Sequence, residues 1–153
     1  MSDYDTDVYA WSARQGTLLR RLAAGERVND ADLDWANIAE EIGTVDRSER
    51  SVLSSHVGNV FEHLIKLRIS PAADPRAGWR ETVLRGRSEA EELLRDSPCL
   101  RPSLGDIMAR RLPTARRLAV AAPDTHGERP TMNPNLLTFD EAQVLGEWFP
   151  DEA

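Results

Sequence analysis

The chain has 153 residues, of which 41% are hydrophobic and 29% charged, and its formal net charge is -7 at pH 7. A chain of this length can bury roughly 70% of its unfolded surface in one core without disulfides, so we expect a single helical domain over residues 1–153. The negative charge opposes general binding to phosphate backbones, and no apolar run approaches the ~20 residues that span a membrane.

The lone cysteine, Cys99, excludes an internal disulfide and a cysteine cluster for zinc. We expect it to be a small buried or half-buried residue that is neither catalytic nor metal-bound. The amino terminus, MSDYDTDVYAWSARQG, is acidic, whereas a secretory signal peptide starts with basic residues and continues with an apolar segment. A cytoplasmic protein is therefore expected.

The first predicted helix runs from Asp3 to Ala24, where apolar side chains recur every three or four residues behind an aspartate that can cap the helix. Gly25 should end this helix. The turn-rich segment GERVNDAD follows, and Asp32 or Asp34 is placed to cap the next helix with an acidic side chain at its electropositive start.

Residues 34–66 carry the longest helical pattern of the chain, with apolar side chains at steps of three and four from Ile38 to Leu64. Gly43 and the polar segment GTVDRSER permit a break before Ser48 caps a new helix. The sequence leaves open whether this stretch is one helix or two. We favour two helices that form an antiparallel hairpin.

Pro71 and Pro75 should close this part of the chain, because proline cannot continue a helix. Another helix is predicted from Gly78 or Trp79 to Arg95, followed by the connector SPCLRPS. Leu104–Ala122 is again helical in pattern, and Pro113 should either kink this helix or start a second segment.

Residues 123–137 contain several prolines and a glycine, so we expect an irregular surface segment that builds no core. Thr138 and Glu141 fit a capping box for a short helix that Gly146 ends. Beyond it, Trp148 and Phe149 are predicted to form an apolar latch that docks the carboxy terminus on the bundle, or on another subunit.

Together these elements predict an all-α bundle of five to seven helices. The core should take the apolar side chains that share the inward faces of these helices, namely Trp11, Leu18, Leu22, Trp35, Ile38, Ile42, Val57, Val60, Leu64, Trp79, Val83, Leu93, Ile107 and Leu118.

Polar side chains lie beside this apolar pattern at helical spacing. Asn37 and Glu41 share one edge of the first half of residues 34–66, and His63 and Lys66 share one edge of the second half. A hairpin would make the two edges face each other, with Arg80 approaching from the next helix. Lys66 is also the only lysine beside eighteen arginines. We therefore take these five residues as a candidate polar cluster, with ordinary solvated helix edges as the alternative.

The spacing of the candidate polar cluster argues against a metal site. Helical bundles that hold metals use glutamate and histidine three residues apart on one helix, but Glu62 and His63 are adjacent. A lysine next to His63 would also repel a divalent cation. We expect no metal and no cofactor, and an acid–base or hydrogen-bonding role for the cluster stays open.

Two groups of arginines could contact nucleic acid. Glutamates alternate with the arginines of the first group in the sequence, which predicts a solvated helix surface with salt bridges. The second group has fewer acidic neighbours, but the net charge opposes this function as well. The groups are Arg80, Arg85 and Arg87, and then Arg110, Arg111, Arg116 and Arg117.

Several stretches together make the chain similar to a known family. They are Tyr4 to Trp11, Leu33 to Ile42, His63 to Lys66, Gly78 to Arg80 and Ser97 to Leu100. In this order they resemble the bacterial domain-of-unknown-function family number 29, over nearly the entire chain. Gly78 and Cys99 stand where the family pattern usually has serine. The resemblance implies an all-helical fold, and it supplies no reaction, ligand or catalytic residue.

The sequence favours a small cytoplasmic binding or regulatory module that acts through protein–protein contacts, with an unidentified protein partner and with homo-oligomers also possible. One alternative is an enzyme or ligand-binding bundle that uses a Glu/His/Lys cluster between helices, with or without a metal. A second alternative is nucleic-acid binding through the arginine groups. No phosphate-binding glycine loop or serine nucleophile motif is present.

Overall fold

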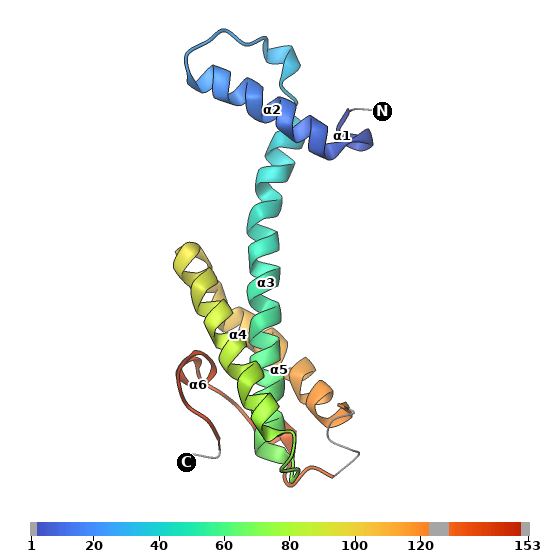
Figure 1. The fold of residues 1–153 in the computed structure, drawn as a ribbon, viewed down its shortest axis with the longest axis vertical. Coiled ribbons are helices and arrows are strands. Elements are labelled where there is room, and N and C mark those ends of the chain that lie inside the picture. The colour runs from blue at the N-terminus through green and yellow to red at the C-terminus, as the bar shows by residue number, and fades with distance from the viewer. Residues whose placement is uncertain (1–2, 123–128, 151–153) are drawn as a thin grey trace. The chain divides into compact units, whose positions relative to one another are not determined.

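The computed structural model describes residues 3–122 and 129–150, and 78% of these residues are helical. No strand occurs among these residues, which confirms the all-α fold. The elements, drawn in Figure 1, are α1 (Asp3–Thr6), α2 (Val8–Ala23), η1 (Asp30–Asp32), α3 (Trp35–Ile69), α4 (Arg76–Asp96), η2 (Pro98–Ser103), α5 (Leu104–Ala121), η4 (Pro134–Leu136) and α6 (Glu141–Leu145). In this part of the chain, no helix combines the length and apolar character required to cross a bilayer.

The first predicted helix is divided at Asp7, whose side chain accepts a hydrogen bond from the backbone N–H of Ala10. Asp7 therefore caps α2 and separates it from the single turn of α1. The predicted end is confirmed, because α2 stops at Ala23 and Gly25 adopts a φ of 80°, which glycine allows without strain.

The predicted hairpin within residues 34–66 is wrong, because α3 is one helix of 35 residues. Gly43 lies within it, and the segment GTVDRSER continues the helix without a break. A glycine in a helix interior costs about 1 kcal/mol relative to alanine. The uninterrupted hydrogen bonds of the turns on either side outweigh that penalty.

The chain divides into two compact units, which we call the N-terminal unit (Met1–Ser48) and the C-terminal unit (Glu49–Ala153). α3 contributes its first part to one unit and its second part to the other. The two units have hydrophobic cores that share no residue.

The N-terminal unit is built around Trp11, Leu33 and Ile38, which come from α2, from the end of η1 and from α3. Tyr4 packs edge-on against Trp11 with ring centroids 4.8 Å apart. Leu18, among other partly buried side chains, completes this small core.

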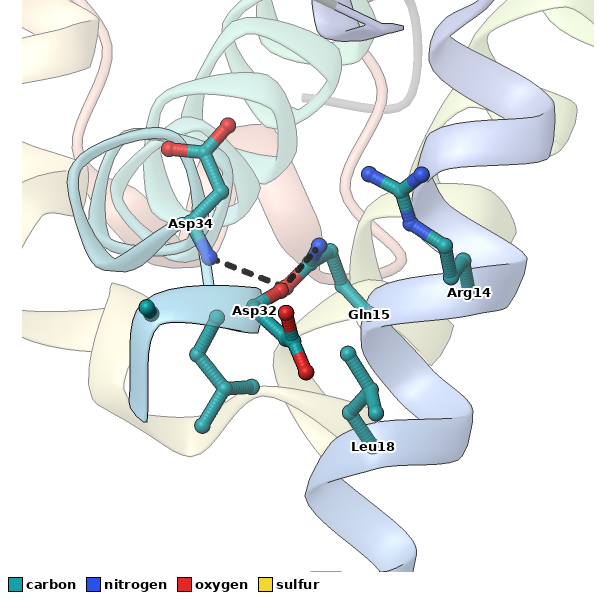
Figure 2. A pocket seen from close by; sticks show the side chains of 7 residues that line it. Arg14, Gln15, Leu18, Asp32 and Asp34 are labelled. Atoms are coloured by element: carbon teal, nitrogen blue, oxygen red, sulfur yellow. Dashed lines mark hydrogen bonds between the residues drawn. The ribbon is translucent and has the colours of Figure 1, made fainter. Parts of the chain in front are cut away.

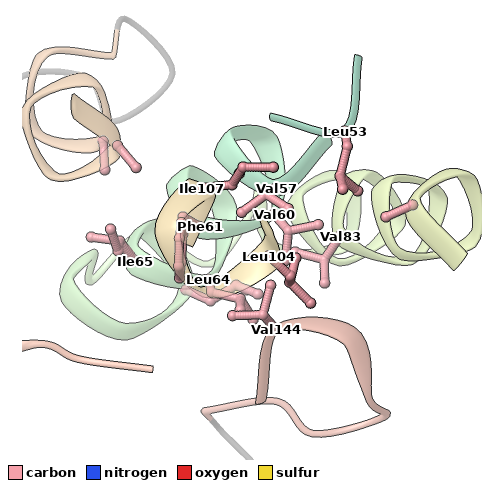
Figure 3. Close-up of a cluster of buried hydrophobic side chains, with 14 of the residues drawn as sticks. Leu53, Val57, Val60, Phe61, Leu64, Ile65, Val83, Leu104, Ile107 and Val144 are labelled. Atoms are coloured by element: carbon pink, nitrogen blue, oxygen red, sulfur yellow. The ribbon is translucent and has the colours of Figure 1, made fainter. Parts of the chain in front are cut away.

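The C-terminal unit has the larger core, shown in Figure 3, in which side chains of α3 meet those of α4, α5 and α6. Fully buried members include Leu53, Val60 and Leu64 of α3. α4 and α3 approach closely at Gly86, where an added Cβ would stand 2.9 Å from Val60 Cγ2. The absence of a side chain at this position lets the two helices pack together.

Most of the predicted core is buried, including Trp11, Ile38, Leu64 and Trp79. Leu18 and Leu93 are partly buried and pack against the cores. Four predictions are wrong because the side chains are exposed, namely Leu22, Trp35, Ile42 and Leu118. In each case the apolar spacing continues along the helix, but the described part of the unit leaves the side chain exposed.

Pro113 lies inside α5, which continues as one helix from Leu104 to Ala121, so of the two alternatives for Pro113 a second helical segment is excluded. The capping box of α6 is formed by Asp140 and Gln143, not by Thr138 and Glu141. Asp140 Oδ1 accepts from the Gln143 N–H at 2.8 Å, and the Gln143 side chain accepts from the Asp140 N–H at 2.9 Å.

The predicted irregular segment lies partly outside the described residues, which resume at residue 129. From there to residue 137 it is irregular apart from the short η4. It does contribute to the core, contrary to expectation, because Met132 and Leu137 pack against it. The apolar latch on this chain is confirmed, since Phe149 is buried and Trp148 packs against the same core.

Candidate functional site

The five residues of the predicted polar cluster belong to different units. The cluster was inferred from the hairpin, which the structure does not contain. Asn37 and Glu41 lie in the N-terminal unit, whereas His63, Lys66 and Arg80 lie in the C-terminal unit. Each group has contacts of its own, and the two groups are described separately.

In the N-terminal unit, Asp34 collects hydrogen bonds from two elements. The indole N–H of Trp11 donates to Asp34 Oδ2 at 3.1 Å, and the amide of Asn37 donates to the same oxygen at 2.7 Å. One turn beyond Asn37, the Tyr4 hydroxyl donates to Glu41 Oε1 at 2.5 Å. These bonds attach the first two helices to the start of α3.

The hydrogen bonds shift two pKa values in this unit. The pKa of Asp34 is lowered, first because Asn37 donates to its carboxylate, while partial desolvation works in the opposite direction. The pKa of Tyr4 is raised, first because its hydroxyl donates to Glu41 and then because the ring is desolvated. Both shifts favour the protonation states that hold the network together at neutral pH.

Beside this network is a cavity of about 550 Å³, lined by Arg14, Gln15 and Leu18 of α2 and by the chain through Asp32 and Asp34 (Figure 2). Gln15 is buried and spans the loop: its amide donates to the Asp32 carbonyl at 3.2 Å and its oxygen accepts from the Asp34 N–H at 3.0 Å. The amide of Gln15 therefore serves the backbone and fixes one wall of the cavity.

An apolar stripe on α3 continues beyond the core of the N-terminal unit. Trp35, Ile38, Ile42 and Val45 are spaced by three, four and three residues and so share one face of the helix. Ile38 is buried, but Ile42 is 69% exposed, Val45 58% and Trp35 46%. Glu41 and Asp46 stand on the two edges of this stripe. The exposed surface is thus apolar with acidic borders.

In the C-terminal unit, Lys66 is buried and forms an ion pair with Glu62 one turn earlier, at 2.9 Å. Its ammonium also lies 5.9 Å from the centre of the Trp79 ring. His63 contacts the Asn59 carbonyl through Nδ1 at 2.8 Å. The sequence prediction paired Lys66 with Glu41, whereas this structural contact joins it to Glu62.

Arg80 and Arg87 of α4 stack on the buried ring of Phe149, at 4.0 and 4.8 Å from its centre. Arg87 also donates to the carbonyls of Gln143, Val144 and Trp148, so it satisfies the end of α6 and the chain beyond it. Desolvation lowers the pKa of Arg87, and Glu91 counteracts this. These contacts hold the latch in place.

A smaller cavity of about 160 Å³ lies between α3 and α5. It contains charged, amide and hydroxyl groups together with short apolar side chains. We call it the α3–α5 groove and define it by Gly58, Asn59, Glu62, Arg111, Thr114 and Leu118.

The other groups considered from the sequence have plain structural contacts. Arg85 pairs with Glu81 and Arg110 with Asp106, each within one helix, as expected of solvated helix faces. Cys99 is exposed, which corrects the expectation of burial. Among the described residues, no three His, Cys, Asp or Glu side chains gather as a metal site would require.

Sequence reasoning missed Glu62 and Arg111 as members of one site. The sequence shows that Glu62 lies three residues after Asn59 and that Arg111 lies seven residues before Leu118, so each pair shares a helix face. It does not show that α3 packs against α5. Trp11 was predicted as a core residue and Asp34 as a helix cap. Their positions in the sequence gave no sign that the Trp11 indole donates a hydrogen bond to the Asp34 carboxylate.

A family model described as domain of unknown function DUF29 matches residues 4–149. No curated protein and no solved structure matches the chain. The stretches that carry the resemblance meet in space within each unit. Tyr4 and Trp11 bond to Glu41 and Asp34 in one unit, and Lys66 lies over Trp79 in the other.

Proposed function

The chain belongs to the family of domains of unknown function DUF29, and this family supplies no reaction. We propose that the protein is a binding module that docks a basic amphipathic helix of another protein. The docking surface is the exposed apolar stripe of α3 formed by Trp35, Ile42 and Val45. The observation that carries the proposal is the continuation of this stripe past the core of its own unit.

The chemistry of the stripe selects its occupant. Isoleucine and valine side chains contribute about 1.5–3 kcal/mol each when fully buried, so an apolar helix face is favoured against them. The carboxylate of Glu41 borders the stripe, and a partner with lysine or arginine beside its apolar face would complement it. A second copy of this chain would bring like charges together instead, which disfavours self-association.

We extend the proposal to location and place this activity in the bacterial cytoplasm. The single cysteine is exposed and forms no disulfide, as is common in a reducing compartment.

A model peptide tests the docking surface. The full chain is titrated by calorimetry with an 18-residue synthetic helix that carries leucines on one face and lysines beside them, and with a counterpart in which glutamates replace the lysines. We expect the lysine peptide to bind at least about tenfold more tightly, and its affinity to fall as salt is raised.

Two variants locate the binding. Ile42→Ser should weaken binding of the lysine peptide by about tenfold or more, because it removes an apolar side chain that the bound peptide would cover. Leu136→Ser is the matched control, since Leu136 is an exposed leucine of the C-terminal unit, and it should bind as the parent does. Equal binding by Ile42→Ser and the parent would overturn the proposal. So would a dimer in sedimentation equilibrium that dissociates in Ile42→Ser, because the occupant would then be a second copy.

A further inference from the structure

Two charged residues, Arg111 and Glu62, line the α3–α5 groove. Arg111 provides one cation, and the carboxylate of Glu62 is matched by Lys66 at 2.9 Å. The Glu62 and Lys66 side chains are mostly buried, at 19% and 5% exposure, so bulk solvent screens this pair little. The charge of the groove is thus that of the Arg111 guanidinium.

Arg111 is held in position by contacts with α3. Its Nε donates to Ser54 Oγ at 2.6 Å, and its side chain lies over Gly58, where an added Cβ would be 3.6 Å from Arg111 Cδ. No protein atom among the described residues accepts from its two terminal nitrogens. A guanidinium fixed through Nε presents those nitrogens side by side, in the geometry that suits the two oxygens of a carboxylate.

The rest of the groove limits the size and polarity of a ligand. Its volume of about 160 Å³ is smaller than the ~300 Å³ at which sites for drug-sized ligands begin. Asn59 and Thr114 offer an amide and a hydroxyl, and Leu118 offers an apolar surface. Leu118 is one of the four residues that were predicted in the core and that the structure leaves exposed.

We propose that the α3–α5 groove binds a small monocarboxylate with a short apolar tail, whose carboxylate pairs with Arg111 and whose tail lies on Leu118. The site is independent of the docking stripe, because it lies entirely in the C-terminal unit. Each of the two proposals can therefore fail alone.

Amide chemical shifts of the ¹⁵N-labelled full chain test this site. The probes are butyrate, butylammonium with a similar tail and the opposite charge, and inorganic phosphate. Butyrate should give saturable shifts around Gly58, Asn59 and Arg111, and should bind at least about tenfold more tightly than the other two. Tighter binding of butylammonium would assign the groove to cations through Glu62, and tighter binding of phosphate would exclude the carboxylate class. Either result overturns the proposal.

Variants separate binding from folding. Arg111→Gln should weaken butyrate by about tenfold or more, whereas Arg110→Gln, on the adjacent residue with its own partner Asp106, should leave it unchanged. Gly58→Leu should block the groove, and leucine favours the helical conformation more than glycine does. Unaltered butyrate shifts in a folded Gly58→Leu variant would contradict the assignment.

Discussion

Asp34 shows how a single residue can join several elements. Its two carboxylate oxygens accept from the backbone N–H of Asn37 at 3.4 Å, from the Asn37 amide and from the Trp11 indole. Its backbone N–H donates to the side-chain oxygen of Gln15. The start of α3 and α2 therefore meet at Asp34, and its carboxylate is the better acceptor of these bonds when it is ionised.

Stability of the N-terminal unit should consequently fall in acid. The pKa of Asp34 is lowered in the folded protein, so its contribution is fully present above the unfolded pKa of about 3.9 and is lost as pH falls through the folded pKa. Near pH 6, Asp34→Asn should have a lower Tm than the parent. The difference between the two Tm values should shrink as the pH is lowered below about 3.9, and a difference in Tm that is constant with pH would contradict this role. Thermal unfolding by circular dichroism measures both.

At the scale of elements, α3 shows where a sequence pattern is ambiguous. Its apolar spacing predicted helix correctly on both sides of Gly43, but glycine and a polar segment are equally compatible with a turn or with an exposed helix surface. What decided the outcome was the sum of many backbone bonds, which no single residue displays. The capping box of α6 was predicted at the wrong pair for a similar reason. Four nearby residues carry side chains that can cap a helix, namely Thr138, Asp140, Glu141 and Gln143.

Gly43→Ala distinguishes a continuous helix from a turn. An added Cβ would meet only the terminal nitrogen of Arg47, at 3.8 Å, so alanine fits and should stabilise α3 by about 0.5–1 kcal/mol. Urea unfolding monitored by circular dichroism gives the free energy of unfolding. A turn that required glycine would instead make the alanine variant less stable than the parent.

Gly86 should respond in the opposite direction although it is also a helical glycine. An alanine Cβ would stand 2.9 Å from Val60 Cγ2, and Val60 is fully buried. Overpacking of this kind costs about 1–3 kcal/mol. Gly78→Ala on the same helix is the control, because nothing lies within 4 Å of its added Cβ. The urea midpoint should fall for Gly86→Ala and hold or rise for Gly78→Ala.

At the scale of the whole molecule, the separate cores predict separate responses to mutation. Leu64→Ala should cost about 2–5 kcal/mol and Trp11→Ala about 3–5 kcal/mol. Because the cores share no residue, hydrogen exchange should accelerate in α4 and α5 for the first variant, and in α2 for the second. Equal acceleration throughout the chain in both variants would indicate one cooperative unit.

Periodicity gave the fold class and most buried positions, because a helix repeats its faces at short range. It could not give the groupings of the candidate site, since these depend on which helices pack together. Lys66 was correctly singled out as unusual, yet its carboxylate neighbour is Glu62 one turn away and not Glu41. Arg111 was considered only as part of a basic surface, although one of its nitrogens is engaged by Ser54 from another helix.

Lys66 also allows the opening of α3 to be measured by proteolysis. It is the only lysine in the chain, and the structure buries it to 4% exposure within α3. A lysine-specific endoprotease can therefore cut this chain at one internal bond, Lys66–Leu67, and only when that part of α3 opens. At low protease concentration the rate of this single cleavage should follow the population of the open form, so two fragments on a gel would measure the opening of α3 without any label.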